Sequence, residues 1–480
     1  MAALPEDIFF ASISELGAKL RAGEVSPVEL TRAFCDRFER LGPRYNAIAL
    51  SLREQAIRKA REFEGDFKHD RARGPLHGIP FGVKDLLAVK GHPTTWGAKP
   101  YAGQVFDYDA YVIEKLTFAR AILIGKLAMV ELAGGGGYRL PSASLTGPGL
   151  NPWDRSRWTG GSSSGPGAAV AAGLVTFALG SETSGSILIP SAYCGLTGLR
   201  PTYGLVSRRG AMALSWTMDK IGPMCRTADD CGLVLQAIAG GDSEDPGSAG
   251  RSFTHTPQFA RKPQDITVGY APVDFAEWAD PAARPGFQAA LEVIKSLGVK
   301  LREVEIPDFP YSALTSSIIG AEAGSIFEDL IRSGDVNQLA DRRQIAGLKA
   351  GLEISAAEYL RAMRIRTLVQ QAFLQLFLDV DMLLTPTRLT VATKINEPLD
   401  GPAVAGRPVP KSRGLNGLIP AANLAGLPGL SLPCGFADNL PIAISLVGRS
   451  FSDGHLLNLG SAFQSHTDWH RRHPLVHSAT

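Results

Sequence analysis

Two loops built almost entirely of glycine and hydroxyl residues, at 158–167 and 180–191, constrain this chain more than any other feature. The segment between them, 168–179, is apolar enough to be fully buried, and we expect one short helix there. Small residues let successive backbone N–H groups converge on one point, so each loop can bind an anion or a developing oxyanion. A single such loop is more typical of a flexible connector, but connectors do not enclose a buried helix. We therefore expect the chemistry of the protein in these loops.

Length and charge restrict the class of protein. A chain of 480 residues is long enough for a large α/β unit with a buried site. Its 49 basic and 47 acidic residues nearly balance, which gives no electrostatic reason to expect nucleic acid or an acidic membrane as a partner. The five cysteines form no C-x-x-C pair, and no segment resembles a signal peptide or a transmembrane helix. These features predict a cytoplasmic protein that acts on a small molecule, binds neither nucleic acid nor membrane, and can form a homodimer.

From residue 75 onward, apolar runs of strand length alternate with helical patterns. Capping-box sequences at Ser12 and Ser26 predict two earlier helices, and 47–65 reads as a third. The expected strands are 79–83, 121–125, 266–270 and 301–306, and the expected helices between them are 111–120, 227–239 and 282–297. This alternation predicts an α/β fold in which a mixed sheet is sandwiched between layers of helices.

We expect one intertwined domain over residues 1–480. Its expected parts are an N-terminal helical layer (1–65), a catalytic core (66–240), a βαβ continuation (241–310), a helical cap-like insertion (311–380) and a sheet-closing segment (381–480). The last part contains strand-like runs that begin at Met382, Leu430 and Pro441.

Other chemistries are possible for the glycine-rich loops. The G-x-S-x-G pattern at 161–165 would make Ser163 a hydrolase nucleophile, but the polar residues 154–157 are not the apolar strand that must precede it. His466 and His470 lack the glutamate of an H-E-x-x-H zinc motif, so we expect no metal and a solvated polar helix there. Binding of a nucleotide or another anion by 160–167 at the start of a helix remains an alternative function.

Lys84 ends an apolar run at 78–85. Burial at the end of a strand would lower the pKa of its amine and let it act as a neutral base. The other interpretation is a surface lysine that pairs with Asp85.

Three motifs, in this order, resemble those of the amidase-signature serine hydrolases. They are the lysine motif at 78–85, the Gly-Gly-Ser-Ser loop at 160–163 and the nucleophile loop at 180–190, with the shorter matches 151–154 and 198–202 beside them. The resemblance covers most of the chain and is weakest at about 240–380. It implies the amidase-signature fold, with a large twisted mixed sheet between helical layers, and no metal or organic cofactor.

The resemblance also implies a Ser-cisSer-Lys triad. Ser186 is the implied nucleophile, Ser162 the proton shuttle after a cis peptide bond from Gly161, and Lys84 the base; Ser163 is a supporting residue that holds the amine. The implied oxyanion donors are the backbone N–H groups of Thr183, Ser184, Gly185 and Ser186. Such a hydroxyl relay performs the work of a histidine base.

Departures from the family pattern bear on the substrate. Leu188 stands where the family usually has arginine, and Glu182 where it usually has aspartate. Gly135 and Gly136 belong to a run of glycines that replaces bulkier residues of a loop lining the acyl pocket, so we expect an open, apolar-tolerant pocket. Arg209 is a candidate for orienting the substrate carbonyl, or else a surface residue in a salt bridge.

We therefore expect a stand-alone amidase for small aryl or alkyl amides, with esterase and carbamate (urethanase) activity. The stretch 208–220 is similar to stand-alone bacterial amidases of this family. The alternative is the glutamine-hydrolysing component of a tRNA-dependent amidotransferase, which works with partner subunits. The missing arginine at position 188 and the divergent segment 311–378 favour the first interpretation.

Overall fold

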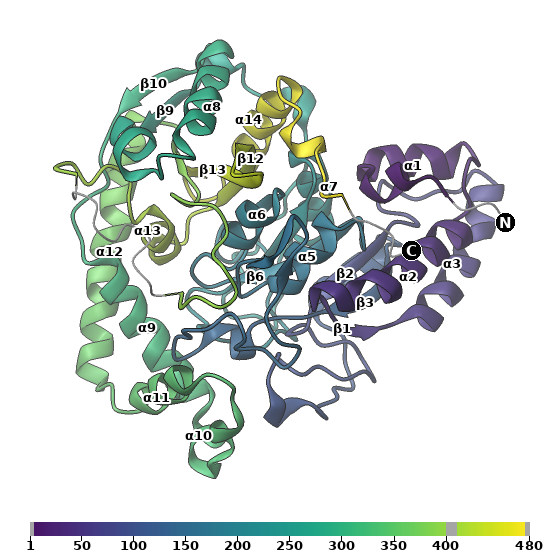
Figure 1. Ribbon diagram of the computed structural model, residues 1–480, viewed down its shortest axis with the longest axis horizontal. Coiled ribbons are helices and arrows are strands. Elements are labelled where there is room, and N and C mark those ends of the chain that lie inside the picture. Colours follow the sequence, from purple (N-terminus) through teal and green to yellow (C-terminus); the bar gives the residue numbers. More distant parts are fainter. Residues whose placement is uncertain (1–3, 400–409, 476–480) are drawn as a thin grey trace.

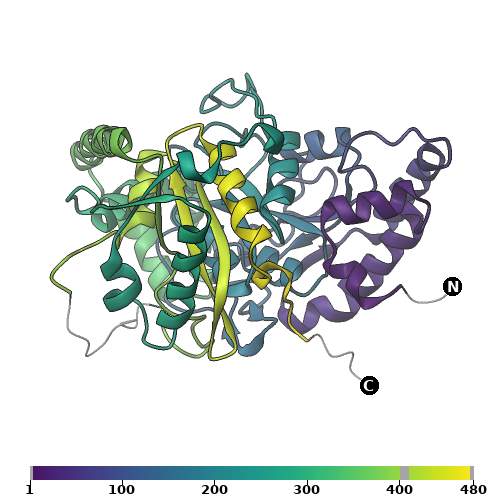
Figure 2. The same cartoon turned by 90° about the horizontal axis from the view of Figure 1, so that it is seen from above.

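The computed structural model describes residues 4–399 and 410–475. Its centre is a mixed sheet of eleven strands in the order β1-β3-β2-β6-β8-β7-β12-β13-β11-β9-β10, with helices packed on both faces (Figures 1 and 2). The strands are β1 Ile48–Ser51, β2 Pro80–Lys84, β3 Ile122–Leu127, β6 Phe177–Glu182, β7 Thr197–Arg200, β8 Lys220–Cys225, β9 Thr267–Tyr270, β10 Lys300–Glu303, β11 Met382–Pro386, β12 Gly429–Ala437 and β13 Leu440–Gly448. β4 Leu150–Asn151 and β5 Asp154–Trp158 form a separate two-stranded sheet. The predicted fold class is confirmed.

The helices are α1 Ile13–Arg21, α2 Pro27–Leu41, α3 Arg53–Lys68, α4 Tyr111–Phe118, α5 Ser164–Ala171, α6 Leu188–Cys194, α7 Ala228–Ile238, α8 Arg284–Ser296, α9 Tyr311–Ile326, α10 Glu328–Ser333, α11 Arg342–Gly351, α12 Ala356–Asp379, α13 Leu418–Ala425 and α14 Asp453–Ser465. The predicted helices at 111–120, 227–239 and 282–297 are present as α4, α7 and α8. Both capping boxes form, because Ser12 and Ser26 each accept a hydrogen bond from the backbone of the glutamate three residues later. In the part of the chain that the structure describes, no helix is long and apolar enough to cross a membrane.

Two parallel strands in the sheet, β2 and β6, bring the candidate residues together. Phe81 of β2 lies opposite Phe177 of β6, and their rings stack with centroids 5.1 Å apart. Every residue of both strands is buried. Because the strands are parallel neighbours, their carboxyl ends meet at one edge of the sheet, which places Lys84 beside the loop that follows β6.

The segment 168–179 was expected to be one helix, and this is wrong. α5 ends at Ala171 and β6 begins at Phe177. Gly173 adopts a φ of 65° between them, and a Cβ there would lie 2.9 Å from the backbone oxygen of Phe9. A strand covered on both faces is apolar throughout, so its sequence cannot be told from that of a buried helix.

Two shorter predictions also need correction. Residues 48–51, expected within a helix, form the edge strand β1 before α3 begins. α14 ends at Ser465, and His470 is only 6% exposed, so the expected solvated helix at 466–470 is absent. These elements are too short to show a clear period in the sequence.

Four of the five expected segments contribute strands to the one sheet, and 311–380 is helical as expected. α9 to α12 lie along one side of the molecule in Figure 1, away from α1 to α3. The division into a core, a continuation and a cap-like insertion remains a prediction.

Candidate active site

Lys84 is completely buried at the end of β2. Its Nζ lies 2.7 Å from Ser162 Oγ and 2.9 Å from Ser181 Oγ. Burial lowers the pKa of the amine to about 7, although the carboxylates of Asp219 and Glu182 oppose the shift. Near neutral pH a large fraction of Lys84 is therefore uncharged, as a general base requires.

Asp85 does not pair with Lys84. Consecutive residues of an extended chain point to opposite sides, and Asp85 forms its ion pair with Lys126 of β3, whose Nζ lies 2.7 Å from Asp85 Oδ1. Both partners are fully buried. The interpretation of Lys84 as a surface lysine that pairs with Asp85 is therefore wrong. The charged partner of Asp85 is Lys126.

The two serines after Gly161 have different contacts. The peptide bond between Gly161 and Ser162 is cis, as predicted, and the Ser162 hydroxyl faces Lys84. Ser163 Oγ instead donates to the backbone oxygen of Ser181 at 3.2 Å and accepts from its N–H at 3.3 Å. Ser163 thus holds the end of β6, while the Ser181 side chain contacts the amine.

Sequence reasoning missed Ser181. It is the first hydroxyl of the nucleophile loop, so its composition offered no reason to separate it from its neighbours. Its contact with Lys84 depends on the pairing of β2 with β6, which joins residues 97 positions apart.

The loop from Thr183 to Ser186 is the predicted source of oxyanion donors, and it is partly buried. Gly185 has a φ of 93°, a conformation that favours glycine. None of the four N–H groups of this loop donates a hydrogen bond to a described residue. Ser186 is half-buried, and no hydrogen bond joins its hydroxyl to another described side chain. Four free donors beside an accessible hydroxyl can stabilise the oxyanion of an acyl-transfer reaction.

The buried carboxylate of Glu182 holds the residues that follow this loop through hydrogen bonds. Its carboxylate accepts from the backbone N–H groups of Ile187 at 2.9 Å and Leu188 at 3.0 Å. It also binds the guanidinium of Arg200 at 2.8 Å and the amide of Asn423 at 2.9 Å. Burial alone would raise the pKa of Glu182, but the nearby cations and hydrogen bonds lower it to about 2. The clamp fixes the start of α6 directly after Ser186.

Replacing Glu182 by glutamine is expected to lower the free energy of unfolding by about 3–5 kcal/mol, because Arg200 would stay buried without its counter-charge. Urea unfolding at pH 7 measures this. A matched control is Glu62→Gln, which removes an exposed ion pair with Lys59 and should cost about 0–1 kcal/mol.

The stability difference between wild type and Glu182→Gln should depend on pH. The folded pKa of Glu182 is about 2, below the ordinary 4.5, so its contribution is complete above pH 4.5 and is lost as the pH falls toward 2. The difference in stability between wild type and Glu182→Gln should therefore shrink in acid. A difference independent of pH would contradict this assignment.

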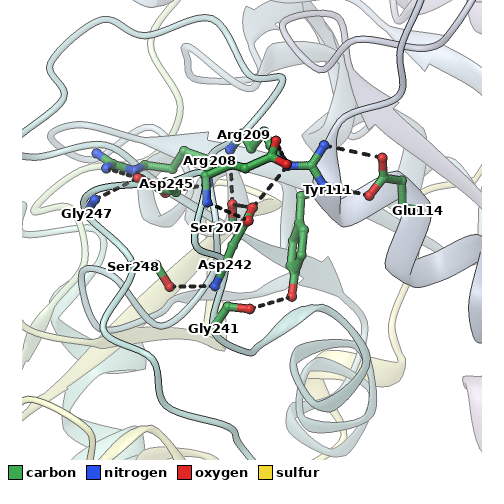
Figure 3. A network of polar contacts seen from close by, with 11 residues as sticks. Tyr111, Glu114, Ser207, Arg208, Arg209, Gly241, Asp242, Asp245, Gly247 and Ser248 are labelled. Atoms are coloured by element: carbon green, nitrogen blue, oxygen red, sulfur yellow. Dashed lines mark hydrogen bonds and ion pairs between the residues drawn. The ribbon is translucent and has the colours of Figure 1, made fainter.

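Arg209 is held by ion pairs, which favours the second of its two interpretations. Its guanidinium reaches Glu114 at 2.7 Å and Asp242 at 3.1 Å (Figure 3). The neighbouring Arg208 is bound in the same way to Asp245 at 2.7 Å. Both arginines line a cavity of about 230 Å³ that also contacts Ser181 and Thr183. Because their charges are already neutralised, neither is free to orient a substrate carbonyl.

The glycines at 135 and 136 do not open a pocket as expected. A Cβ on Gly136 would lie 2.4 Å from the backbone oxygen of Gln344 in α11, and one on Gly135 would lie 2.9 Å from Leu214. α11 therefore packs its backbone directly on this run. The space that bulkier residues would take is filled by a helix.

Comparisons with known proteins agree with this geometry. The sequence model of the Amidase family matches residues 29–457. The A component of the glutamyl-tRNA(Gln) amidotransferase of Carboxydothermus hydrogenoformans is 36% identical, over 98% of this chain and 99% of its own. The protein of the same name from Dechloromonas aromatica is 37% identical, over 97% of this chain and 99% of its own. The crystal structure of the Thermotoga maritima protein of this name covers 99% of both chains, with 28% identity and a TM-score of 0.80.

These relatives overturn two expectations. They carry the name of one component of an amidotransferase, so the expected stand-alone amidase with ester and carbamate activity is wrong. The name includes a tRNA and implies other subunits, so the exclusion of nucleic acid and the restriction to a small-molecule partner are wrong as well. The balanced net charge of this chain did not predict its partners, since the charge of one chain does not give the charge of a multi-subunit enzyme. Leu188 and the divergent segment 311–378 were given too much weight, because relatives of this name match nearly the whole chain.

Proposed function

Since this chain belongs to the amidase family, whose chemistry acts on carbon–nitrogen bonds, we propose that it is the glutamine-hydrolysing component of a glutamyl-tRNA(Gln) amidotransferase. The observation that carries the chemical part of this proposal is the buried amine of Lys84, with a pKa of about 7, at 2.7 Å from Ser162. The name that the relatives share, glutamyl-tRNA(Gln) amidotransferase, supports the assignment of the substrates. In this proposal, ammonia released from glutamine is passed to glutamyl-tRNA bound by partner subunits.

The relay begins with the neutral amine of Lys84. Its lone pair accepts the proton of Ser162 Oγ, while Ser162 takes the proton of Ser186 as Ser186 Oγ attacks the amide carbon of glutamine. A neutral amine keeps two N–H groups, and Ser181 Oγ at 2.9 Å is placed to accept one of them. Ser181 is thus a positioning residue that turns the lone pair toward Ser162.

The tetrahedral intermediate carries a negative oxygen. The backbone N–H groups of residues 183–186 are the proposed donors to it, and loss of one such donor typically costs about 2.7–4 kcal/mol. Ser162 then returns its proton to the departing nitrogen, so that ammonia leaves and a glutamyl ester remains on Ser186. Water, activated through the same relay, hydrolyses this ester to glutamate.

A glutaminase assay with and without the other subunits of the amidotransferase tests this function. We expect slow release of ammonia from L-glutamine by the chain alone, and a faster release, coupled to amidation of glutamyl-tRNA, in the assembled enzyme. Glutamine that stays intact in both preparations, with rapid hydrolysis of an anilide by the chain alone, would refute the proposal.

Glutaminase activity should rise with pH through about 7. Protonated Lys84 has no lone pair for Ser162, and its pKa of about 7 means that the active, neutral form increases up to and beyond that pH. The measurement is kcat/KM for glutamine between pH 5.5 and 9, with circular dichroism as a control for folding. An optimum on the acid side of pH 6 would contradict the neutral-lysine base.

A further inference from the structure

Thr183 is the first residue of the loop that carries the proposed oxyanion donors, and a carboxylate holds its side chain. Glu182 lies opposite Lys220 in the antiparallel pair of β6 and β8, so Thr183 and Asp219 lie side by side where the two strands end. Thr183 Oγ1 donates a hydrogen bond of 2.6 Å to Asp219 Oδ1. A hydrogen bond to a charged acceptor is stronger than one between neutral groups. This bond therefore fixes the start of the loop.

The second oxygen of Asp219 is also occupied by hydrogen bonds. Asp219 Oδ2 accepts from the backbone N–H groups of Leu214 and Ser215, each at 2.8 Å. Asp245, which lines the same cavity of about 230 Å³, is neutralised by Arg208 (Figure 3). Asp219 instead makes no ion pair with a described residue and is held by three hydrogen-bond donors. Its contacts are those of a group that joins two segments of backbone.

Two helices hold the segment on which Asp219 lies. Thr217 Oγ1 donates to Glu322 of α9 at 2.8 Å, and the Ser215 hydroxyl donates to the same carboxylate. The hydroxyl of Tyr359 in α12 also donates to Glu322, at 2.8 Å. Glu322 is buried, so these bonds are shielded from water. Asp219 therefore connects the oxyanion loop to a fixed part of the fold.

We propose that Asp219 is a positioning residue, which through the Thr183 hydroxyl holds the backbone N–H groups of 183–186 where they meet the oxyanion. This inference rests on the acyl-transfer chemistry of the proposed function, and not on the identity of the substrate. Gly185, with a φ of 93°, gives the loop conformational freedom. Asp219 fixes the start of the loop, and Glu182 fixes the residues that follow it. Donors that are already in place cost no reorganisation as the negative charge develops.

Thr183→Val keeps the shape of the side chain and removes its hydrogen bond. In the assembled enzyme it should lower kcat for glutamine about ten- to hundredfold, because small displacements of catalytic groups are costly, and leave KM within about threefold. Thr183→Ser keeps the hydroxyl and should restore the rate. The assay is run at pH 8, where Lys84, with a pKa of about 7, is mostly neutral.

Asp219→Asn should lower kcat as Thr183→Val does, because a carboxamide has a single acceptor oxygen and cannot accept from donors on both sides. The double variant Thr183→Val/Asp219→Asn should be no slower than the slower single variant, since both changes remove the same bond. Losses of kcat that multiply in the double variant would overturn the inference.

Thr202→Val is the matched control. Thr202 Oγ1 donates to Asp453 Oδ2 at 2.6 Å, a buried bond of the same kind that joins the residues after β7 to α14. Thr202→Val should lower the thermal midpoint, as Thr183→Val does, and keep the kcat of the wild type. A wild-type kcat in Thr183→Val, or an equal loss of kcat in Thr202→Val, would overturn the inference.

If the wild-type enzyme does not hydrolyse glutamine, the proposed substrate fails, and a fluorophosphonate decides the inference. In its reaction Ser186 Oγ attacks phosphorus, the serine proton passes to the relay, fluoride leaves, and the phosphoryl oxygen gains negative charge. Mass spectrometry measures the rate at which Ser186 is labelled. Slower labelling of Thr183→Val than of wild type and Thr183→Ser supports the inference, and equal rates overturn it. A wild type that is not labelled would overturn both the inference and the acyl-transfer mechanism.

Discussion

Ser186→Ala should lower kcat for glutamine by about 10⁴–10⁶, the loss that follows removal of the nucleophile of a serine hydrolase. The variant keeps the backbone N–H groups of residues 183–186 and the clamp by Glu182, so the site can still bind substrate. Because no acyl-enzyme can form, only the residual effect of the oxyanion donors remains. The measurement is ammonia release by the assembled enzyme at saturating glutamine.

Two controls separate chemistry from folding. Ser156→Ala removes an exposed hydroxyl on β5 and should keep full activity. The thermal midpoint of Ser186→Ala should equal that of wild type, since the Ser186 hydroxyl has no hydrogen bond to lose in the described structure. Activity within tenfold of wild type would remove Ser186 from the mechanism and make another hydroxyl of the loop the nucleophile.

The second large effect is expected for Lys84→Met, which keeps most of the side-chain volume and removes the base. Loss of general-base catalysis should lower kcat by about 10²–10⁴. Lys84→Arg should be equally inactive, because a guanidinium stays protonated at every relevant pH and cannot accept the proton of Ser162. Both variants are assayed with glutamine at pH 8.

Lys126 provides a matched control for Lys84. It too is fully buried, in the neighbouring strand β3, but it pairs with Asp85. Lys126→Met should destabilise the fold by about 3–5 kcal/mol, because Asp85 loses its counter-charge. Lys84→Met should not, since the folded pKa of about 7 lies below the ordinary 10.5, and a buried amine of this kind opposes folding wherever the unfolded chain is protonated. Loss of stability without loss of activity in Lys84→Met would reverse the assigned roles.

Local patterns predicted much of the fold. The capping boxes at Ser12 and Ser26 and the apolar runs around β2, β3 and β9 depend on residues a few positions apart, so a single sequence contains all the information. The boundary between α5 and β6 was missed because a strand buried on both faces and a buried helix are equally apolar.

Sequence by itself determined the residue types of the candidate site: an amine after an apolar strand, a serine after two glycines, and a serine in a loop of small residues. Each of these features depends on a few consecutive residues. Lys84 and Ser162 lie in hydrogen-bonding contact, as expected. Only the tertiary structure decided which groups surround them. Ser181 meets Lys84, Arg200 neutralises Glu182, and Asp219 binds Thr183 across 97, 18 and 36 positions of sequence respectively. These contacts arise from the order of strands in the sheet, and no local pattern encodes that order.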